Sequence, residues 1–120
     1  MKQTMQAAML YGREELRVEE VPVPSVKSDD ILVKVRVALT CGTDLKVFRR
    51  GYHARMIRPP AVLGHEGVGT ILSMGIDQHR AKLREGTRVS WSLVDCCRKC
   101  AYCTDFEIPE KCEFLFKYGH

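Results

Sequence analysis

Five cysteines fall in one short stretch, 95-DCCRKCAYCTDFEIPEKC-112, and they constrain this chain more than any other feature. Two residues separate Cys97 from Cys100 and Cys100 from Cys103, and Cys112 follows after eight more. Repeated Cys-x2-Cys spacing is typical of zinc sites, which take four thiolates in a tetrahedron. The alternative, four ordinary free or buried cysteines, does not explain such regular spacing. The stretch therefore predicts a zinc site on these four residues.

Cys96 and Cys97 compete for the first ligand position. Adjacent side chains of an extended segment point to opposite sides, so only one of the two faces a metal easily. Cys97 gives equal steps of three residues to Cys100 and Cys103, whereas Cys96 gives a first step of four, which zinc also accepts. We favour Cys97 as the ligand. We expect Cys96 to be a small core residue whose sulfur points away from the metal.

The composition is that of an ordinary globular domain. The chain has 120 residues, of which 45% are hydrophobic and 28% charged, and its net charge is +4. A domain of this length buries a core of its own. The mild positive charge is compatible with an anionic ligand, but the basic pair Arg49-Arg50 has no interleaved aromatic residues, so we expect no nucleic-acid partner.

No stretch of the sequence reads as a signal peptide or a membrane span. The best apolar run, ILVKVRVAL, is interrupted by Lys34 and Arg36. Six cysteines without a secretory signal point to a reducing compartment, where thiols bind metals rather than form disulfides. We therefore expect a cytoplasmic protein with no membrane partner.

Alternating apolar residues predict short strands. In residues 31–39 a period of two places Val33, Val35 and Val37 on one face of a half-buried strand. Further strands are predicted over residues 14–21, with Leu16 and Val18 on one face, over residues 67–72, and over residues 87–94, with Val89, Trp91 and Leu93 together. Short strands with frequent turns predict a mainly β barrel or sandwich.

One short helix is expected after the 31–39 strand. Thr43 or Asp44 is placed to cap it, Leu45 and Phe48 would form its apolar side, and Gly51 would stop it.

A second set of potential zinc ligands lies earlier in the chain. Cys41 follows the 31–39 strand in 41-CGTDL, and His65 and Glu66 stand in 64-GHEGVG, at the start of another strand. All three side-chain types bind zinc. Each also has an ordinary alternative, a core cysteine or a surface histidine. The spacing alone leaves both interpretations open.

Four motifs together resemble one known family. CGTDLKVFRRG, GHEGVGTI, EGTRVSW and Cys-x2-Cys-x2-Cys-x8-Cys are similar, in order and approximate spacing, to the zinc-dependent alcohol dehydrogenases of the medium-chain dehydrogenase/reductase family. The resemblance covers residues 5–120. It implies one GroES-like catalytic domain over residues 1–120, mainly β, built as a partly open β-barrel with a zinc-binding lobe.

The resemblance also implies two zinc sites. The four-cysteine cluster would hold a structural zinc. Cys41 and His65 would bind a catalytic zinc, with Glu66 as a further ligand or its neighbour, and Thr43 would relay the alcohol proton. Two departures stand out: Lys46 replaces the His of many members, and the last gap of the cysteine motif has eight residues where seven are usual, so that loop needs a bulge or a shifted ligand.

The implied reaction is the reversible oxidation of a small alcohol or polyol to an aldehyde or ketone with NAD(P). We expect no cofactor-binding residue in these 120 residues, because Gly64-x-x-Gly67-x-Gly69 has the wrong order and context for a dinucleotide fingerprint and fits a strand with close backbone packing. We therefore expect no turnover by the chain alone, and a homo-oligomer formed through uncovered apolar surface. The alternative is a non-catalytic zinc-binding module derived from this domain.

Overall fold

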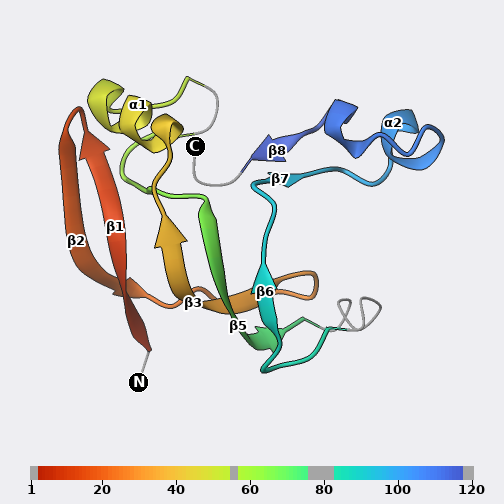
Figure 1. Ribbon diagram of the computed structural model, residues 1–120, viewed down its shortest axis with the longest axis horizontal. Helices are drawn as coiled ribbons and strands as arrows, with labels where there is room; N and C mark the ends of the chain where they lie inside the picture. The colour runs from red at the N-terminus through yellow and green to blue at the C-terminus, as the bar shows by residue number, and fades with distance from the viewer. Residues whose placement is uncertain (1–2, 55–56, 76–82, 118–120) are drawn as a thin grey trace.

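Two three-stranded antiparallel sheets form the body of the molecule (Figure 1). The structure is a computed structural model and describes residues 3–54, 57–75 and 83–117. In the first sheet, β1 (Thr4–Gly12) lies between β2 (Glu15–Pro22) and β4 (Ala61–Val62). Strand β1 was missed by the sequence analysis, although its Leu10 is fully buried. Strand β1 is flanked by β2 and β4 and packs against a helix, and these tertiary contacts bury Leu10. The alternation of residues within 4–12 does not reveal them.

The second sheet runs in the order β3 (Ile31–Leu39), β5 (Glu66–Met74), β6 (Arg88–Ser90). A Cβ atom on Gly69 would lie 2.4 Å from Cγ1 of Val33, and one on Gly67 would lie 2.6 Å from the Trp91 ring. Neither position has room for a larger residue. The prediction of a strand with close backbone packing is confirmed for Gly67 and Gly69, but it is wrong for Gly64, which precedes β5 and has open space around it.

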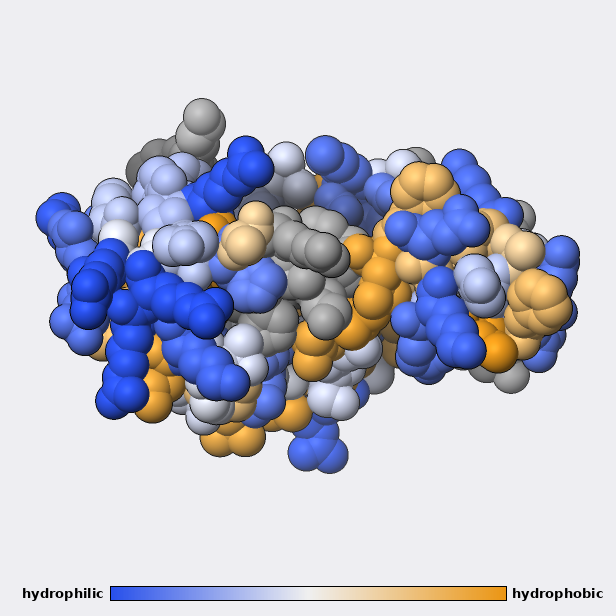
Figure 2. All heavy atoms as spheres, turned by 90° about the horizontal axis from the view of Figure 1, so that it is seen from above, coloured by the Kyte–Doolittle hydropathy of each residue, from blue (hydrophilic) through white to orange (hydrophobic). Residues whose placement is uncertain are grey.

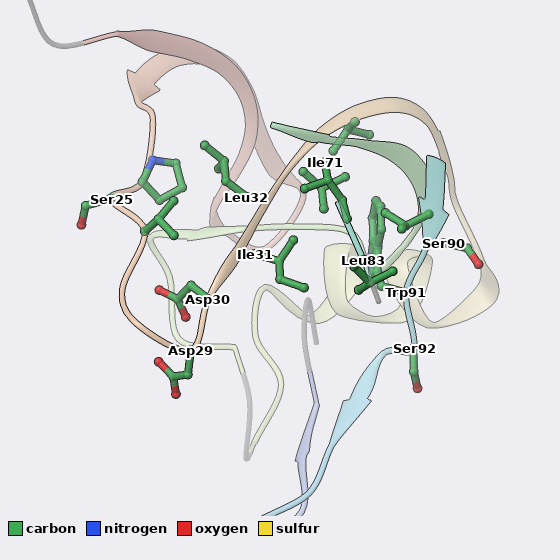
Figure 3. A pocket seen from close by; sticks show the side chains of 15 residues that line it. Ser25, Asp29, Asp30, Ile31, Leu32, Ile71, Leu83, Ser90, Trp91 and Ser92 are labelled. Carbon is green, nitrogen blue, oxygen red and sulfur yellow. The ribbon is translucent and has the colours of Figure 1, made fainter. Parts of the chain in front are cut away.

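An open cavity of about 590 Å³ lies against the β3-β5-β6 sheet and the loop that precedes β3. Figure 3 shows Ile31, Ile71, Leu83 and Trp91 converging on it, with Asp29 and Asp30 at its edge. The sheets share no hydrogen-bonded strand pair among the described residues. This arrangement is the partly open, mainly β barrel that the sequence predicts.

The predicted buried faces of two strands are largely uncovered. Val35 and Val37 are each 54% exposed, Leu16 is 42% exposed and Val18 is 73% exposed. The conclusion that these faces are half-buried is wrong for these residues. The prediction of one shared face also fails at Val37, because a register shift pairs Val35 with Gly69 but Val37 with Val68, the adjacent residue of β5. Within the described part of the chain, no element packs closely enough on them to bury them.

Helix α1 (Gly42–Arg50) crosses the end of the first sheet (Figure 1). Val47 is buried and forms the main core with Leu10 and Ile57; this core is edged by Phe48, Ala61 and Leu63. Leu45, expected on the apolar side, is 46% exposed. As predicted, the helix stops at Gly51, whose φ of 82° is in the left-handed region that suits glycine.

A lobe projects from the barrel (Figures 1 and 2). It contains β7 (Val94–Asp95), α2 (Ala101–Thr104), a 3₁₀ turn η2 (Pro109–Lys111) and β8 (Phe116–Lys117). The strand predicted over residues 87–94 is therefore divided. Its first part pairs with β5 as β6, and its end pairs with β8 as β7, because the chain leaves the barrel sheet at Trp91. No helix among the described residues has the length and apolar character needed to cross a bilayer.

Candidate metal centres

The sulfur atoms of Cys97, Cys100, Cys103 and Cys112 converge in the lobe, all within 4.8 Å of one another. Three separations are 4.0 Å for Cys97–Cys103, 3.6 Å for Cys100–Cys103 and 3.9 Å for Cys100–Cys112. Four sulfurs bound to one tetrahedral zinc at about 2.3 Å would lie about 3.8 Å apart. The quartet therefore has the size that zinc requires.

Local backbone geometry aims N–H groups at these sulfurs. The Cys97 sulfur accepts from the N–H groups of Lys99 and Cys100 at 3.4 and 3.3 Å. The Cys112 sulfur accepts from those of Cys97 and Phe114, both at 3.3 Å. The donors place partial positive charge beside these two sulfurs, which stabilises thiolates rather than neutral thiols.

The pKa values of the thiols respond to this environment. Backbone N–H groups, that of Lys99 first, lower the pKa of Cys97. The N–H of Glu113 makes the largest contribution in lowering the pKa of Cys100 to about 6. Desolvation and the neighbouring Cys100 thiol raise the pKa of Cys103 instead. Burial and the neighbouring thiols therefore oppose a negative charge on Cys103. A bound dication would offset that effect.

The eight-residue gap before Cys112 does not displace that ligand. The chain turns at Glu107, with φ of 53° in the left-handed region, and then through η2, whose end leads directly into Cys112. Both turns shorten the loop enough for the Cys112 sulfur to reach the cluster.

Cys96 lies outside the quartet but close to it. It is half-buried rather than a core residue, which corrects the prediction of a buried position. Its sulfur is not among the four that lie within 4.8 Å of one another.

A second cluster forms where α1 and β5 begin. The Cys41 sulfur lies 3.2 Å from Nε2 of His65, and Oε1 of Glu66 lies 3.8 Å from the same nitrogen. His65 is buried, whereas the Glu66 side chain is 42% exposed. All three ligand atoms fall within 4.8 Å of one another. The pairing of β3 with β5, which sets Leu39 opposite Glu66, brings these residues together across 24 positions of sequence.

Asp44 connects the two ligands of this cluster, and the sequence analysis assigned it no such role. Its Oδ2 accepts from the backbone N–H of Cys41 at 2.9 Å, and its Oδ1 lies 3.2 Å from Nδ1 of His65. It is buried, with 4% exposed. A carboxylate beside Nδ1 favours a proton on that nitrogen, which leaves the lone pair of Nε2 facing Cys41. The donor set therefore suits a metal.

The helix cap explains how Cys41 is held. The N-cap of α1 is Cys41, and not Thr43 or Asp44. Its sulfur accepts a hydrogen bond from the N–H of Thr43 at 3.3 Å, and the Asp44 carboxylate accepts one from the N–H of Cys41. This is a capping box with cysteine in the usual place of serine. The one available signal was Asp44 three residues after Cys41, a spacing that fits a capping box.

The large cavity is not at either cluster. Its lining contains none of the candidate ligands and is mostly apolar. We interpret it as barrel interior and not as the place where the polar chemistry of the clusters occurs.

Comparisons with known proteins identify the family of the chain. Residues 27–119 match the family described as the alcohol dehydrogenase GroES-like domain. Sorbitol dehydrogenase of Bombyx mori is 38% identical over 98 residues, which is 81% of this chain and 28% of that protein. The alcohol dehydrogenase TADH from Thermus sp. ATN1 superposes with a TM-score of 0.83 at 31% identity, over 96% of this chain and 32% of that one.

A further solved relative, a dehydrogenase from Escherichia coli CFT073 in complex with NADH, has a TM-score of 0.79 at 28% identity over 97% of this chain and 32% of its own. The chain thus spans about a third of the proteins it matches. It belongs to the alcohol dehydrogenase GroES-like domain family, among the zinc-dependent medium-chain dehydrogenases/reductases.

Proposed function

We propose that this chain is the zinc-binding catalytic portion of an alcohol or polyol dehydrogenase, which oxidises a small alcohol to an aldehyde or ketone with NAD(P). The observation that carries the proposal is the buried His65 with its Nε2 3.2 Å from the Cys41 sulfur and its Nδ1 3.2 Å from Asp44. A structural fold alone does not need a cysteine, a histidine and a carboxylate at these separations.

In this proposal the lobe quartet holds a structural zinc, and Cys41, His65 and Glu66 hold a catalytic one. A zinc ion bound there supplies Lewis-acid polarisation of the alcohol oxygen, which makes the alcohol proton easier to remove. Asp44 keeps His65 in one tautomer and fixes the Cys41 backbone. Glu66, being partly exposed, is free to move between the metal and solvent.

Thr43 is the proposed first acceptor of the alcohol proton. It lies in the first turn of α1, two residues after Cys41, and its backbone N–H already contacts the Cys41 sulfur. A nicotinamide would supply the hydride acceptor, and the chain's own residues do not hold it in this proposal. Without a fixed nicotinamide the reaction loses the proximity contribution, about 7–11 kcal/mol.

Activity of the complete gene product tests this proposal. We expect NAD(P)H formation with a panel of polyols and simple alcohols, abolished by Cys41→Ser and by His65→Ala. A complete protein that binds zinc in the lobe but oxidises no alcohol would favour a non-catalytic zinc module instead. Zinc content of each variant separates loss of the catalytic metal from loss of folding.

We also propose that the chain self-associates through the uncovered apolar side chains of β3 and β5. Val37, Leu39, Val68 and Leu72 are each between 46% and 64% exposed. Exposed apolar side chains gathered on one pair of strands drive association. Light scattering should show dimers or larger species, and Val37→Lys should shift the protein toward monomer. A monomer at high concentration would contradict the proposal.

A further inference from the structure

The solvent-facing side of α1 carries a line of positive charge. Lys46, Arg49 and Arg50 are all exposed. Lys46 and Arg50 stand three and seven residues after Thr43, so these three side chains follow one stripe of the helix surface. Thr43 is also the residue whose backbone N–H contacts the Cys41 sulfur. The positive stripe therefore starts beside the candidate ligands of the barrel and leads away from them.

A fourth cation lies at the far end of this stripe. Arg13, in the turn between β1 and β2, is exposed, and its backbone N would lie 2.3 Å from a Cβ atom on Gly51, the C-cap of α1. The N–H of Glu14 donates to the carbonyl of Phe48 at 2.8 Å, which holds the turn against the helix. Figure 2 shows strongly hydrophilic side chains gathered at this end of the molecule, opposite the lobe. We call the four cations the basic cluster: Arg13, Lys46, Arg49 and Arg50.

The charge of the basic cluster is not balanced within the described part of the chain. None of its four side chains forms an ion pair with another described residue. Arginines in the last turn of a helix stabilise its dipole, which accounts for Arg49 and Arg50 but not for Lys46 or Arg13. Cations held near one another without an anion repel. A bound anion would remove that repulsion.

We propose that the basic cluster binds the phosphate of a phosphorylated polyol whose reacting hydroxyl group lies at Cys41 and His65. This inference rests on the proposed function and narrows its substrate class to polyol phosphates. A phosphate monoester carries about two negative charges at neutral pH and three acceptor oxygens. Arginine and lysine side chains are the groups that proteins use to bind it.

The length of α1 sets the length of the substrate. The helix rises about 1.5 Å per residue, so Lys46 lies about 4.5 Å and Arg50 about 10 Å beyond Thr43 along its axis. Single bonds between heavy atoms are about 1.5 Å long, so a chain of five or six carbons covers that span. A terminal phosphate on a pentitol or hexitol would reach the basic cluster while a hydroxyl group near the other end lies at Cys41. An anionic macromolecule does not need this alignment with Thr43.

The substrate preference of the complete gene product tests the inference, with sorbitol and sorbitol 6-phosphate as probes. We expect kcat/KM to be at least about 30-fold higher for the phosphate ester, and Lys46→Gln and Arg50→Gln each to reduce that preference about 10-fold, as expected for one lost hydrogen bond between charged groups. Lys111→Gln is the matched control, because it removes an exposed positive charge from the lobe. It should leave the preference unchanged.

Binding of inorganic phosphate by the 120-residue chain gives a readout that does not depend on turnover. In NMR spectra, phosphate should shift the backbone amide signals of Arg13 and of residues 46–51, and Lys46→Gln should weaken this binding about 10-fold. Shifts spread evenly over the exposed cations of the whole chain would contradict the proposal.

Three results of the activity measurements would overturn the inference in different ways. Equal kcat/KM for sorbitol and sorbitol 6-phosphate would leave an alcohol dehydrogenase without a phosphate site. A KM for NAD(P) that rises in Lys46→Gln, with that for sorbitol 6-phosphate unchanged, would assign the basic cluster to the cofactor. A complete protein that oxidises neither probe nor any other alcohol would remove the proposed function, and the inference with it.

Discussion

The two candidate metal sites are built in opposite ways. The lobe takes four sulfurs from residues 97–112, orients them with backbone N–H groups of the same segment, and has its main contacts among its own elements. The barrel cluster joins the start of α1 to the start of β5, and a buried carboxylate, Asp44, connects its two main ligands. The first cluster draws all its candidate ligands from one short segment. The second draws them from two elements that only the pairing of β3 with β5 brings together.

The largest effect is expected when one sulfur of the lobe quartet is removed, because only the lobe should lose its metal and its order. Cys100→Ser should abolish tight zinc binding in the lobe and remove hydrogen-exchange protection over residues 94–115. In small thiolate sites the binding energy of zinc, about 10–16 kcal/mol, is folding energy. Protection of β1 and β2 should persist, because the lobe contributes little to that sheet.

Cys41→Ser is the matched control for this experiment, since it removes a sulfur from the barrel cluster. It should leave protection of the lobe unchanged. Protection of the lobe that survives Cys100→Ser would show that the segment folds without its metal.

The second prediction compares zinc affinities directly. The barrel cluster offers one sulfur, one nitrogen and an exposed carboxylate, against four sulfurs in the lobe. We expect about one firmly bound zinc per chain and a second at least about 100-fold weaker, a difference of about 3 kcal/mol. Titration against a competing chelator measures the two zinc dissociation constants. Two equal affinities would contradict the expected difference between the clusters.

The third prediction concerns Asp44, whose loss should disturb only the barrel cluster. Asp44→Ala removes the acceptor of the Cys41 N–H and the carboxylate beside Nδ1 of His65. Leaving such buried groups without partners costs about 1–3 kcal/mol each, so we expect a destabilisation of about 2–4 kcal/mol in urea unfolding. Metal affinity at Cys41 and His65 should fall about 10- to 100-fold.

Two controls accompany this variant. Asp44→Asn keeps one acceptor oxygen and should cost less, and Asp105→Ala changes an exposed aspartate and should have almost no effect. A lobe affinity that falls together with that of the barrel cluster would mean that the two clusters are coupled.

The smallest effect distinguishes thiols within the lobe. In the metal-free protein at pH 7, Cys100 should react fastest with iodoacetamide, because its pKa of about 6 leaves it mostly as thiolate. Cys103, whose pKa is raised, should react slowest. Labelling of Cys100 should decline as pH falls through about 6. The lowered pKa of Cys100 stabilises the folded lobe at pH values above the usual pKa of a thiol. This stabilisation is lost as the pH falls from that value through about 6.

Local patterns predicted the parts of the fold that depend on near neighbours in sequence. Strand β3, the end of α1 at Gly51 and the strand through Gly67 and Gly69 all appear where alternation and glycine placed them. Strand β1 was missed because its identity comes from pairing with β2 and β4 on both sides. The register shift between Val35 and Val37 shows the same limit, since alternation within β3 does not reveal an irregularity in its pairing with β5.

By itself, the sequence determined the lobe quartet, because all four cysteines lie within one short stretch whose backbone turns bring them together. Only the tertiary structure decided the barrel cluster. Cys41 and His65 meet because β3 pairs with β5, and Asp44 becomes their common partner because α1 begins where β5 begins. The sequence spacing of Cys41 and His65 does not predict this contact. The two residues are 24 positions apart, and hydrogen bonds between strands bring them together rather than the segment that joins them.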